Sequence, residues 1–267
     1  MIIAILGAGK IGEAVARSIS KSDEISRVII TKRNISTLNA LLPQKISVSS
    51  DNREAVRKAD AVIIAVKAGD AKHVTKEIAE VTKGKLVISL MAAISIARLE
   101  RSLPAAKVVR AMPNIAALID EAITAYTAGK RVTQEDLKKT KLILNCFGDY
   151  LEVPESQMDA ITALSGSGPA HIAVLIDAMV TAGLKVGLPR DVAFKLATKT
   201  LTGTANLLNK KGMHPSELRD AVTTPAGTTI AGIYELEKGS FRTSIINAVE
   251  AATEAATRVA KRFESEY

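Results

Sequence analysis

Two short segments in the second half of the chain combine hydroxyl groups with glycines in a way that suits the binding of a small anion. Residues 165–169 read Ser-Gly-Ser-Gly-Pro, and residues 223–229 read Thr-Thr-Pro-Ala-Gly-Thr-Thr. Each stands before a predicted helix, whose first turn offers unpaired backbone N–H groups and the positive end of the helix dipole. One such segment would be an ordinary capped helix start. Two of them in one part of the chain predict a site for a carboxylate.

A third segment, residues 7–12, has the glycine spacing of a dinucleotide-binding turn. Residues 1–6 are an apolar run, Gly-Ala-Gly-Lys-Ile-Gly follows at once, and residues 13–19 have helical spacing. In the order strand, turn and helix, the first glycine allows a tight turn, the second lets the backbone approach a pyrophosphate, and the third allows close packing. A glycine turn without a ligand is the alternative, and the flanking strand and helix argue against it.

The end of the second predicted strand, residues 27–31, indicates which dinucleotide binds. A fold that prefers NAD places Asp or Glu here to bind the ribose 2′-hydroxyl. This chain has Thr31, Lys32, Arg33 and Asn34 instead. Because a guanidinium can fork onto a phosphate and the other three add charge or donors, the sequence predicts NADP(H). A solvated basic turn is the alternative.

The chain lacks the residue patterns of a metal site or a protein nucleophile. It has three histidines, none in a ligand pattern, and its single cysteine, Cys146, has no partner for a disulfide. No metal is therefore expected. Hydride transfer fits this composition, since the cofactor carries the chemistry and the protein supplies orientation and hydrogen bonds.

Alternating strands and helices must position these segments in the first half of the chain. Residues 61–66 are apolar and β-branched, as in a parallel sheet that is covered on both faces. The strands are expected at residues 1–6, 27–31, 46–48, 61–66, 86–90, 107–112, 122–128 and 150–153, with helices at 13–19, 53–58, 70–81, 96–102 and 134–147. This alternation predicts a Rossmann-like α/β domain over residues 1–154.

Beyond residue 154 the strand pattern ends and only helical stretches follow. These are expected at residues 155–164, 169–186, 190–210, 215–222, 229–238 and 241–263. The last carries small residues that let helices approach closely, namely Ala248, Ala251, Ala252, Ala255, Ala256 and Ala260. We therefore expect residues 155–267 to form an all-α domain for substrate binding and oligomerisation.

Charge and hydropathy bear on partners and location. The net charge is +8, but the cations are spread along the chain without interleaved aromatics, so nucleic acid is not expected as a partner. The apolar stretch 171–188 is interrupted by Asp177 and Lys185, which favours a buried helix over a membrane span. The chain opens on a core strand without a leader, and a cytoplasmic location is expected.

Taken together, these segments resemble pyrroline-5-carboxylate reductase along essentially the whole chain. The family's glycine motif is matched by residues 7–12, its strand-end lysine by Lys67, and its Met-Pro-Asn by residues 112–114. The most specific matches are residues 160–169 (Ala-Ile-Thr-Ala-Leu-Ser-Gly-Ser-Gly-Pro) and 218–229 (Leu-Arg-Asp-Ala-Val-Thr-Thr-Pro-Ala-Gly-Thr-Thr).

The resemblance implies reduction of L-1-pyrroline-5-carboxylate to L-proline, the last step of proline biosynthesis. NADP(H) would be the preferred cofactor and NAD(H) the alternative. The family assembles through the helical domain, which implies a homodimer or a larger ring of dimers such as a decamer. No membrane partner is implied.

The resemblance also implies roles for individual residues. The family's second threonine after Pro-Gly-Gly donates a hydrogen bond near the substrate nitrogen, and this role would fall on Thr229. The substrate carboxylate would lie against residues 165–167 or the 224–228 loop, from the same subunit or its partner. The expected catalytic residues are Ser165, Ser167, Thr224, Gly227, Thr228 and Thr229. The expected cofactor-binding residues are Gly7, Ala8, Gly9, Lys10, Ile11, Gly12, Thr31, Lys32, Arg33, Asn52, Ala65, Val66, Lys67, Met112 and Asn114.

The chain departs from the family pattern at several positions. The family's Pro-Gly-Gly is Pro-Ala-Gly here, with Ala226 at the middle position, and its Ala-Ala-Gly after the fifth strand is Met-Ala-Ala, ending in Ala93. Ala68 replaces a proline, residues 115–116 replace Thr-Pro, and Met213 replaces an acidic residue. Alanine at position 226 costs on the order of 1 kcal/mol if that position requires a positive φ.

Two alternative functions remain open. A reductase of the same architecture could act on a six-membered cyclic imine. A non-catalytic NADP-binding regulator would keep the glycine turn and Arg33 but would have no need of Thr229 or residues 165–169.

Overall fold

The computed structural model describes residues 1–33 and 43–265, so the predicted cofactor residue Asn34 lies outside the described residues. The chain forms two compact units. The first consists of Met1–Ser167 with Glu250–Tyr267, and the second of Gly168–Val249. The expected division into domains 1–154 and 155–267 remains a prediction.

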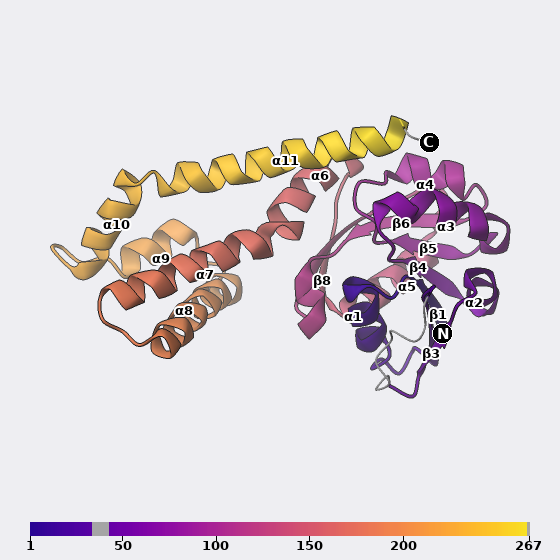
Figure 1. Ribbon diagram of the computed structural model, residues 1–267, viewed down its shortest axis with the longest axis horizontal. Coiled ribbons are helices and arrows are strands. Elements are labelled where there is room, and N and C mark those ends of the chain that lie inside the picture. Colours follow the sequence, from indigo (N-terminus) through magenta and orange to yellow (C-terminus); the bar gives the residue numbers. More distant parts are fainter. Residues whose placement is uncertain (34–42, 266–267) are drawn as a thin grey trace. The chain divides into compact units, whose positions relative to one another are not determined.

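The first unit is built on a mixed sheet of eight described strands in the order β3-β2-β1-β4-β5-β6-β7-β8 (Figure 1). The strands are β1 (Ile2–Leu6), β2 (Arg27–Thr31), β3 (Ile46–Ser49), β4 (Ala61–Ile64), β5 (Leu86–Ser89), β6 (Lys107–Met112), β7 (Ala122–Ala128) and β8 (Gly148–Glu152). β7 runs antiparallel to β6, and every other pairing is parallel. The order 3-2-1-4 reverses direction beside β1, which is where doubly wound sheets bind their ligands.

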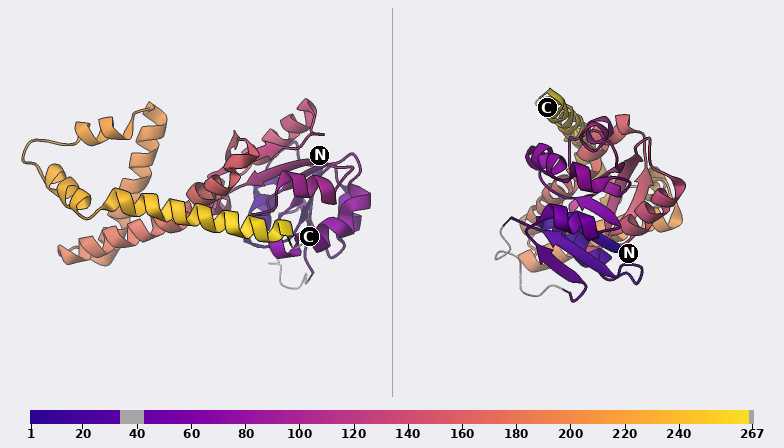
Figure 2. Two further views of the ribbon diagram at one scale, coloured as in Figure 1. Left: turned by 90° about the horizontal axis from the view of Figure 1, so that it is seen from above. Right: turned by 90° about the vertical axis from the view of Figure 1, so that its right-hand side faces the viewer.

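Helices cover both faces of this sheet (Figure 2). Alternate residues of β1 point to opposite faces, so Ile3 and Ile5 pack with α1 (Lys10–Ile19) and α5 (Gln134–Asn145). Leu6 packs on the other face with α2 (Asn52–Lys58), α3 (Ala71–Ile78) and α4 (Ile96–Ser102). The expected Rossmann-like domain is confirmed.

The chain beyond β8 is helical, as expected, but its first helix differs from the prediction. A 3₁₀ turn (Glu155–Gln157) leads into α6 (Met158–Ile161), a π-helical segment (Thr162–Gly166) and then α7 (Gly168–Lys185). The break predicted at residues 165–169 is therefore wrong, because the helix continues through it. Ser167 N donates to Thr162 O at 2.9 Å, which leaves no free helix start there.

The later helices are α8 (Arg190–Lys211), α9 (Pro215–Ala221), α10 (Thr228–Lys238) and α11 (Phe241–Ser265). The end of α11 belongs to the first unit, where Phe263 packs against the core on the α4 face of the sheet.

The prediction that residues 171–188 form a buried helix is wrong for the single chain. Within α7 only Val180 is buried, because α8 covers one narrow stripe of it, whereas Val174 is 73% exposed. Among the described residues, the helix over Glu155–Lys185 is the one that is long and apolar enough to cross a membrane by length and composition. Helices that pack against other protein pass the same test.

Candidate active site

The glycine turn after β1 has the geometry that its sequence predicts. Gly7 has φ +108°, and a Cβ there would lie 2.8 Å from the backbone oxygen of Ala65. A Cβ on Gly12 would lie 1.9 Å from the oxygen of Gly7. Both positions therefore require glycine. A Cβ on Gly9 would meet no heavy atom within 4 Å, so the turn is open at its middle glycine.

The open side of this turn is also the start of α1. Gly9 is the N-cap residue, and its carbonyl accepts from Glu13 N at 2.9 Å. The N–H groups of the first turn, at Lys10, Ile11 and Gly12, have no intrahelical acceptor because none precedes them at the required spacing. These N–H groups and the helix dipole fit a pyrophosphate. Ala8, which is buried, completes the predicted turn.

The predicted 2′-phosphate residues lie at the neighbouring end of β2. Thr31 is buried, and its carbonyl accepts from Gly7 N at 3.2 Å. The Arg33 side chain is 89% exposed, and its Nη2 lies 3.4 Å from Asp70 Oδ1. A loose pair on the surface contributes little to stability, so the guanidinium is available to a ligand. The backbone N of Lys32 donates to Ser49 O at 3.1 Å, which fixes the Lys32 backbone beside the end of β3.

Three further cofactor residues follow β4 at the same edge. Ala65 N donates to Leu6 O at 2.8 Å, which extends the pairing of β4 with β1. The Cγ1 of Val66 lies close to Gly7, 2.9 Å from where a Cβ would stand. Lys67 is the N-cap of a 3₁₀ turn, Ala68–Asp70. The structure thus brings Ala65 and Val66 against the glycine turn, and Lys67 follows them in the chain.

The end of β6 meets the π-helical segment. Asn114 Nδ2 lies 3.5 Å from Ser165 Oγ, and Asn114 Oδ1 accepts from Ala116 N at 3.2 Å. A Cβ on Gly166 would lie 2.9 Å from the Cε of Met112. Residues predicted for the cofactor and for the substrate are therefore neighbours here, although no helix start brings them together.

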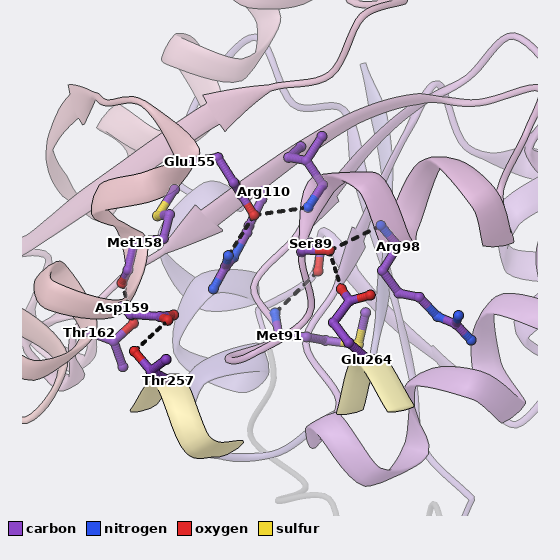
Figure 3. Close-up of polar contacts among 12 residues, drawn as sticks. Ser89, Met91, Arg98, Arg110, Glu155, Met158, Asp159, Thr162, Thr257 and Glu264 are labelled. Carbon is purple, nitrogen blue, oxygen red and sulfur yellow. Dashed lines mark hydrogen bonds and ion pairs between the residues drawn. The ribbon is translucent and has the colours of Figure 1, made fainter. Parts of the chain in front are cut away.

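A partly buried ion pair, whose residues belong to no recognisable motif, supports this junction (Figure 3). Arg110 on β6 is 4% exposed, and its Nη1 lies 2.7 Å from Glu155 Oε1, which also accepts from Ile96 N at 3.0 Å. One carboxylate thus joins β6, the start of α4 and the turn before α6. The one feature of the sequence that could have pointed to this ion pair is Arg110 itself, a charged residue inside a mainly apolar strand.

The last turns of α11 dock beside this pair (Figure 3). Thr257 Oγ1 donates to Asp159 Oδ2 at 3.0 Å, and Glu264 accepts from the Ser95 hydroxyl, the N-cap of α4. Arg101 Nη2 lies 2.9 Å from Glu264 Oε2. The Ser95 hydrogen bond and then the Arg101 contact hold the pKa of Glu264 below its ordinary value.

The remaining predicted catalytic residues belong to the second unit. Gly227 N donates to Thr224 O at 3.1 Å, closing a turn with Pro225 second and Ala226 third. A Cβ on Gly227 would lie 2.3 Å from Thr224 Oγ1 and 3.1 Å from Thr224 O, so a larger residue would have to displace the Thr224 hydroxyl. Gly227 is also the N-cap of α10, which places Thr228 and Thr229 in its first turn. Here the predicted helix start with hydroxyl groups is present.

Within the described residues, no group of three or more His, Cys, Asp and Glu side chains could hold a metal ion.

Comparison with known proteins identifies the family. Residues 155–259 match the family description "Pyrroline-5-carboxylate reductase dimerisation", and residues 2–93 match "NADP oxidoreductase coenzyme F420-dependent". The chain is 40% identical to a pyrroline-5-carboxylate reductase of Methanosarcina acetivorans over 270 residues, covering 97% of this chain and 98% of the relative. The chain belongs to the pyrroline-5-carboxylate reductase family. A relative from Synechocystis is 38% identical over 263 residues, with 97% and 98% coverage.

Solved pyrroline-5-carboxylate reductases share the fold along the whole chain. The Plasmodium falciparum enzyme with NADP bound is 31% identical, with a TM-score of 0.88 and coverage of 97% of this chain and 98% of that one. The Coxiella burnetii enzyme is 29% identical, with a TM-score of 0.89 and coverage of 96% and 97%.

Two departures from the pyrroline-5-carboxylate reductase pattern fall on strained backbone. Ala93 has φ +64° and Ala226 has φ +56°, and both replace family glycines. Alanine in this left-handed region costs on the order of 1–2 kcal/mol. The cost anticipated for Ala226 therefore applies, and it applies to Ala93 as well.

Proposed function

We propose that this protein reduces L-1-pyrroline-5-carboxylate to L-proline, with NADPH as the preferred donor and NADH as the alternative. The supporting observation is membership of the reductase family over 97% of the chain. The bound nicotinamide supplies a hydride to the ring carbon of the C=N bond, and the ring nitrogen takes up a proton.

The first unit binds the cofactor. The turn from Gly7 to Gly12 receives the pyrophosphate on the N-terminus of α1, and Lys32 and Arg33 neutralise the 2′-phosphate. Thr31 and Asn52 contact the adjoining ribose. The other half of the cofactor is held by residues that follow two strands, namely Ala65, Val66, Lys67, Met112 and Asn114.

The substrate is held by hydroxyl groups and backbone N–H groups. Thr229 donates a hydrogen bond to the ring nitrogen. The substrate carboxylate is received by Thr224, Gly227 and Thr228 at the start of α10, where the helix dipole favours negative charge. Ser165 and Ser167 of the first unit are further proposed substrate-binding residues. In an oligomer, the partner subunit can supply one of these two groups.

The helical domain forms the subunit interface of a homodimer, and a decamer as a ring of dimers is the larger assembly that we propose. The exposed apolar side chains of α7 and α8, such as Val174 (73% exposed) and Phe194 (56% exposed), support this interface. Obligate interfaces are more apolar than the remaining surface. We also propose a cytoplasmic location.

The decisive experiment follows cofactor absorbance when purified protein is mixed with NADPH and L-1-pyrroline-5-carboxylate. We expect turnover that falls at least 100-fold in Thr229→Ala, while binding of NADPH is unchanged. Thr202→Ala, a threonine of α8 whose hydroxyl donates within its own helix, is the matched control.

Two other outcomes would redirect the assignment. Turnover on a six-membered cyclic imine but not on the five-membered one would indicate the related reductase. NADPH binding without turnover on either imine would favour a non-catalytic regulator.

A further inference from the structure

A chain of hydrogen-bonded side chains crosses three elements beside the glycine turn. Thr31 ends β2, Asn52 is the first residue of α2, and Glu77 lies near the end of α3. Thr31 Oγ1 lies 2.6 Å from Asn52 Oδ1, and Asn52 Nδ2 lies 2.8 Å from Glu77 Oε2. This series of hydrogen-bonded side chains is connected to the glycine turn because the carbonyl of Thr31 accepts from Gly7 N.

The carboxylate at one end fixes the direction of every hydrogen bond in this chain. A carboxylate only accepts, so Asn52 must turn its NH₂ group toward Glu77. The amide oxygen of Asn52 then faces Thr31. Because that oxygen also only accepts, the Thr31 hydroxyl must donate to it.

The groups next to the end of β2 are consequently acceptors. The hydrogen of the Thr31 hydroxyl is already used, and a second lone pair remains on the amide oxygen of Asn52. A ribose 2′-hydroxyl needs an acceptor, which NAD-binding folds supply as Asp or Glu at this strand end. A 2′-phosphate needs donors instead. Near the end of β2, Lys32 and Arg33 are donors, Asp70 pairs with Arg33, and the amide oxygen of Asn52 is an acceptor tied to Thr31.

We propose that Glu77 determines cofactor specificity by positioning Asn52 as the acceptor for the ribose 2′-hydroxyl of NADH. Glu77 thus replaces, through one intervening amide, the carboxylate that the end of β2 lacks. Lys32 and Arg33 serve the phosphate of NADPH independently of it. This inference rests on the proposed binding of a nicotinamide dinucleotide.

The test measures dissociation constants of NADH and NADPH by fluorescence titration without any imine. In Glu77→Ala we expect the dissociation constant of NADH to rise about fivefold, the effect of one net hydrogen bond, and that of NADPH to change less than twofold. Glu77→Gln should bind both cofactors like the wild type, since its carbonyl oxygen still accepts from Asn52.

A charge reversal sharpens this test. In Glu77→Lys the ammonium can donate only to the oxygen of Asn52, which turns the NH₂ group toward the nucleotide and should shift preference toward NADPH at least tenfold. Glu80→Lys changes charge equally one turn away, on a side chain that is 79% exposed and pairs with Arg53. That control should not alter the NADH-to-NADPH ratio beyond twofold.

A double-mutant cycle tests whether Glu77 acts through Asn52. In an Asn52→Ala background, Glu77→Ala should have no further effect on NADH binding. Additive effects, or equal losses for both cofactors in Glu77→Ala, would overturn the inference while leaving the proposed reductase intact. A wild-type protein that binds neither cofactor would overturn both. Circular dichroism of each variant separates these results from misfolding.

Discussion

The side-chain amide of Asn114 lies 3.5 Å from the hydroxyl of Ser165, 51 residues further along the chain. Asn114 follows β6, the sixth strand of the sheet, and Ser165 sits in a π-helical segment. Such segments occur often at functional sites because one wider turn redirects the side chains on it. This contact joins the predicted cofactor edge to the first predicted substrate segment.

Replacement of Asn114 should separate its two roles. Asn114→Ala removes the cap on the 3₁₀ turn Ile115–Ile119 and the contact with Ser165, so we expect about 1 kcal/mol loss of unfolding free energy and at least tenfold lower kcat/KM. Asn114→Asp keeps an acceptor for the cap and can accept from Ser165, so its stability should stay within about 0.5 kcal/mol. Denaturant titration and initial rates measure both effects. Equal stability of Asn114→Ala and wild type would contradict the capping role.

Restoring glycine at the two strained alanines should stabilise the protein. Ala93→Gly and Ala226→Gly remove a left-handed conformation that alanine tolerates poorly, at the cost of a more flexible unfolded chain. We expect a net gain of about 0.5–1 kcal/mol for each, measured as the free energy of unfolding. Ala92→Gly is the control, since Ala92 has no positive φ and should lose stability. If Ala93→Gly lowered the free energy of unfolding as much as Ala92→Gly does, the backbone at Ala93 would not be strained.

The sheet could be predicted from the sequence because its signals are local. Apolar β-branched runs identified the buried strands β1, β2, β4 and β5, and the glycine spacing identified the turn after β1. The helix break at residues 165–169 was wrong for a physical reason. Glycine and serine lower helix propensity, but the i→i+5 bond from Ser167 to Thr162 keeps the helix continuous.

The contacts that assemble the candidate site could not be predicted in the same way. Arg110 and Glu155 are 45 residues apart, and neither belongs to a motif. The amide orientation of Asn52 depends on Glu77, 25 residues away on another helix. Such partners follow from packing between elements, which no local pattern in a single sequence records.

The losses of stability caused by removing Arg110 and by removing Glu155 should not be additive. Arg110→Leu leaves the carboxylate with one backbone donor, and we expect a loss of about 2–3 kcal/mol, below the full cost of a buried charge because Glu155 is 36% exposed. Arg110→Leu with Glu155→Leu should lose less than the sum of the single variants by at least about 1 kcal/mol. Chemical denaturation of the four proteins measures this coupling. Additive losses would show that the two side chains act independently.

The contact of α11 with α4 should weaken at acid pH. Because the pKa of Glu264 is lower in the folded protein than its ordinary value of 4.5, its contribution to stability is present above that value and is lost as pH falls through the folded pKa. The side chain is 40% exposed, so Glu264→Gln should cost only about 0.5 kcal/mol at pH 7. As the pH falls through the folded pKa, the wild type and the variant should converge, since both then carry a neutral side chain. A series of denaturant titrations from pH 7 into the acid range measures this, with Glu250→Gln, a substitution of the same type earlier in α11, as the control. A difference that stays unchanged across the series would show that the carboxylate charge does not hold α11 to α4.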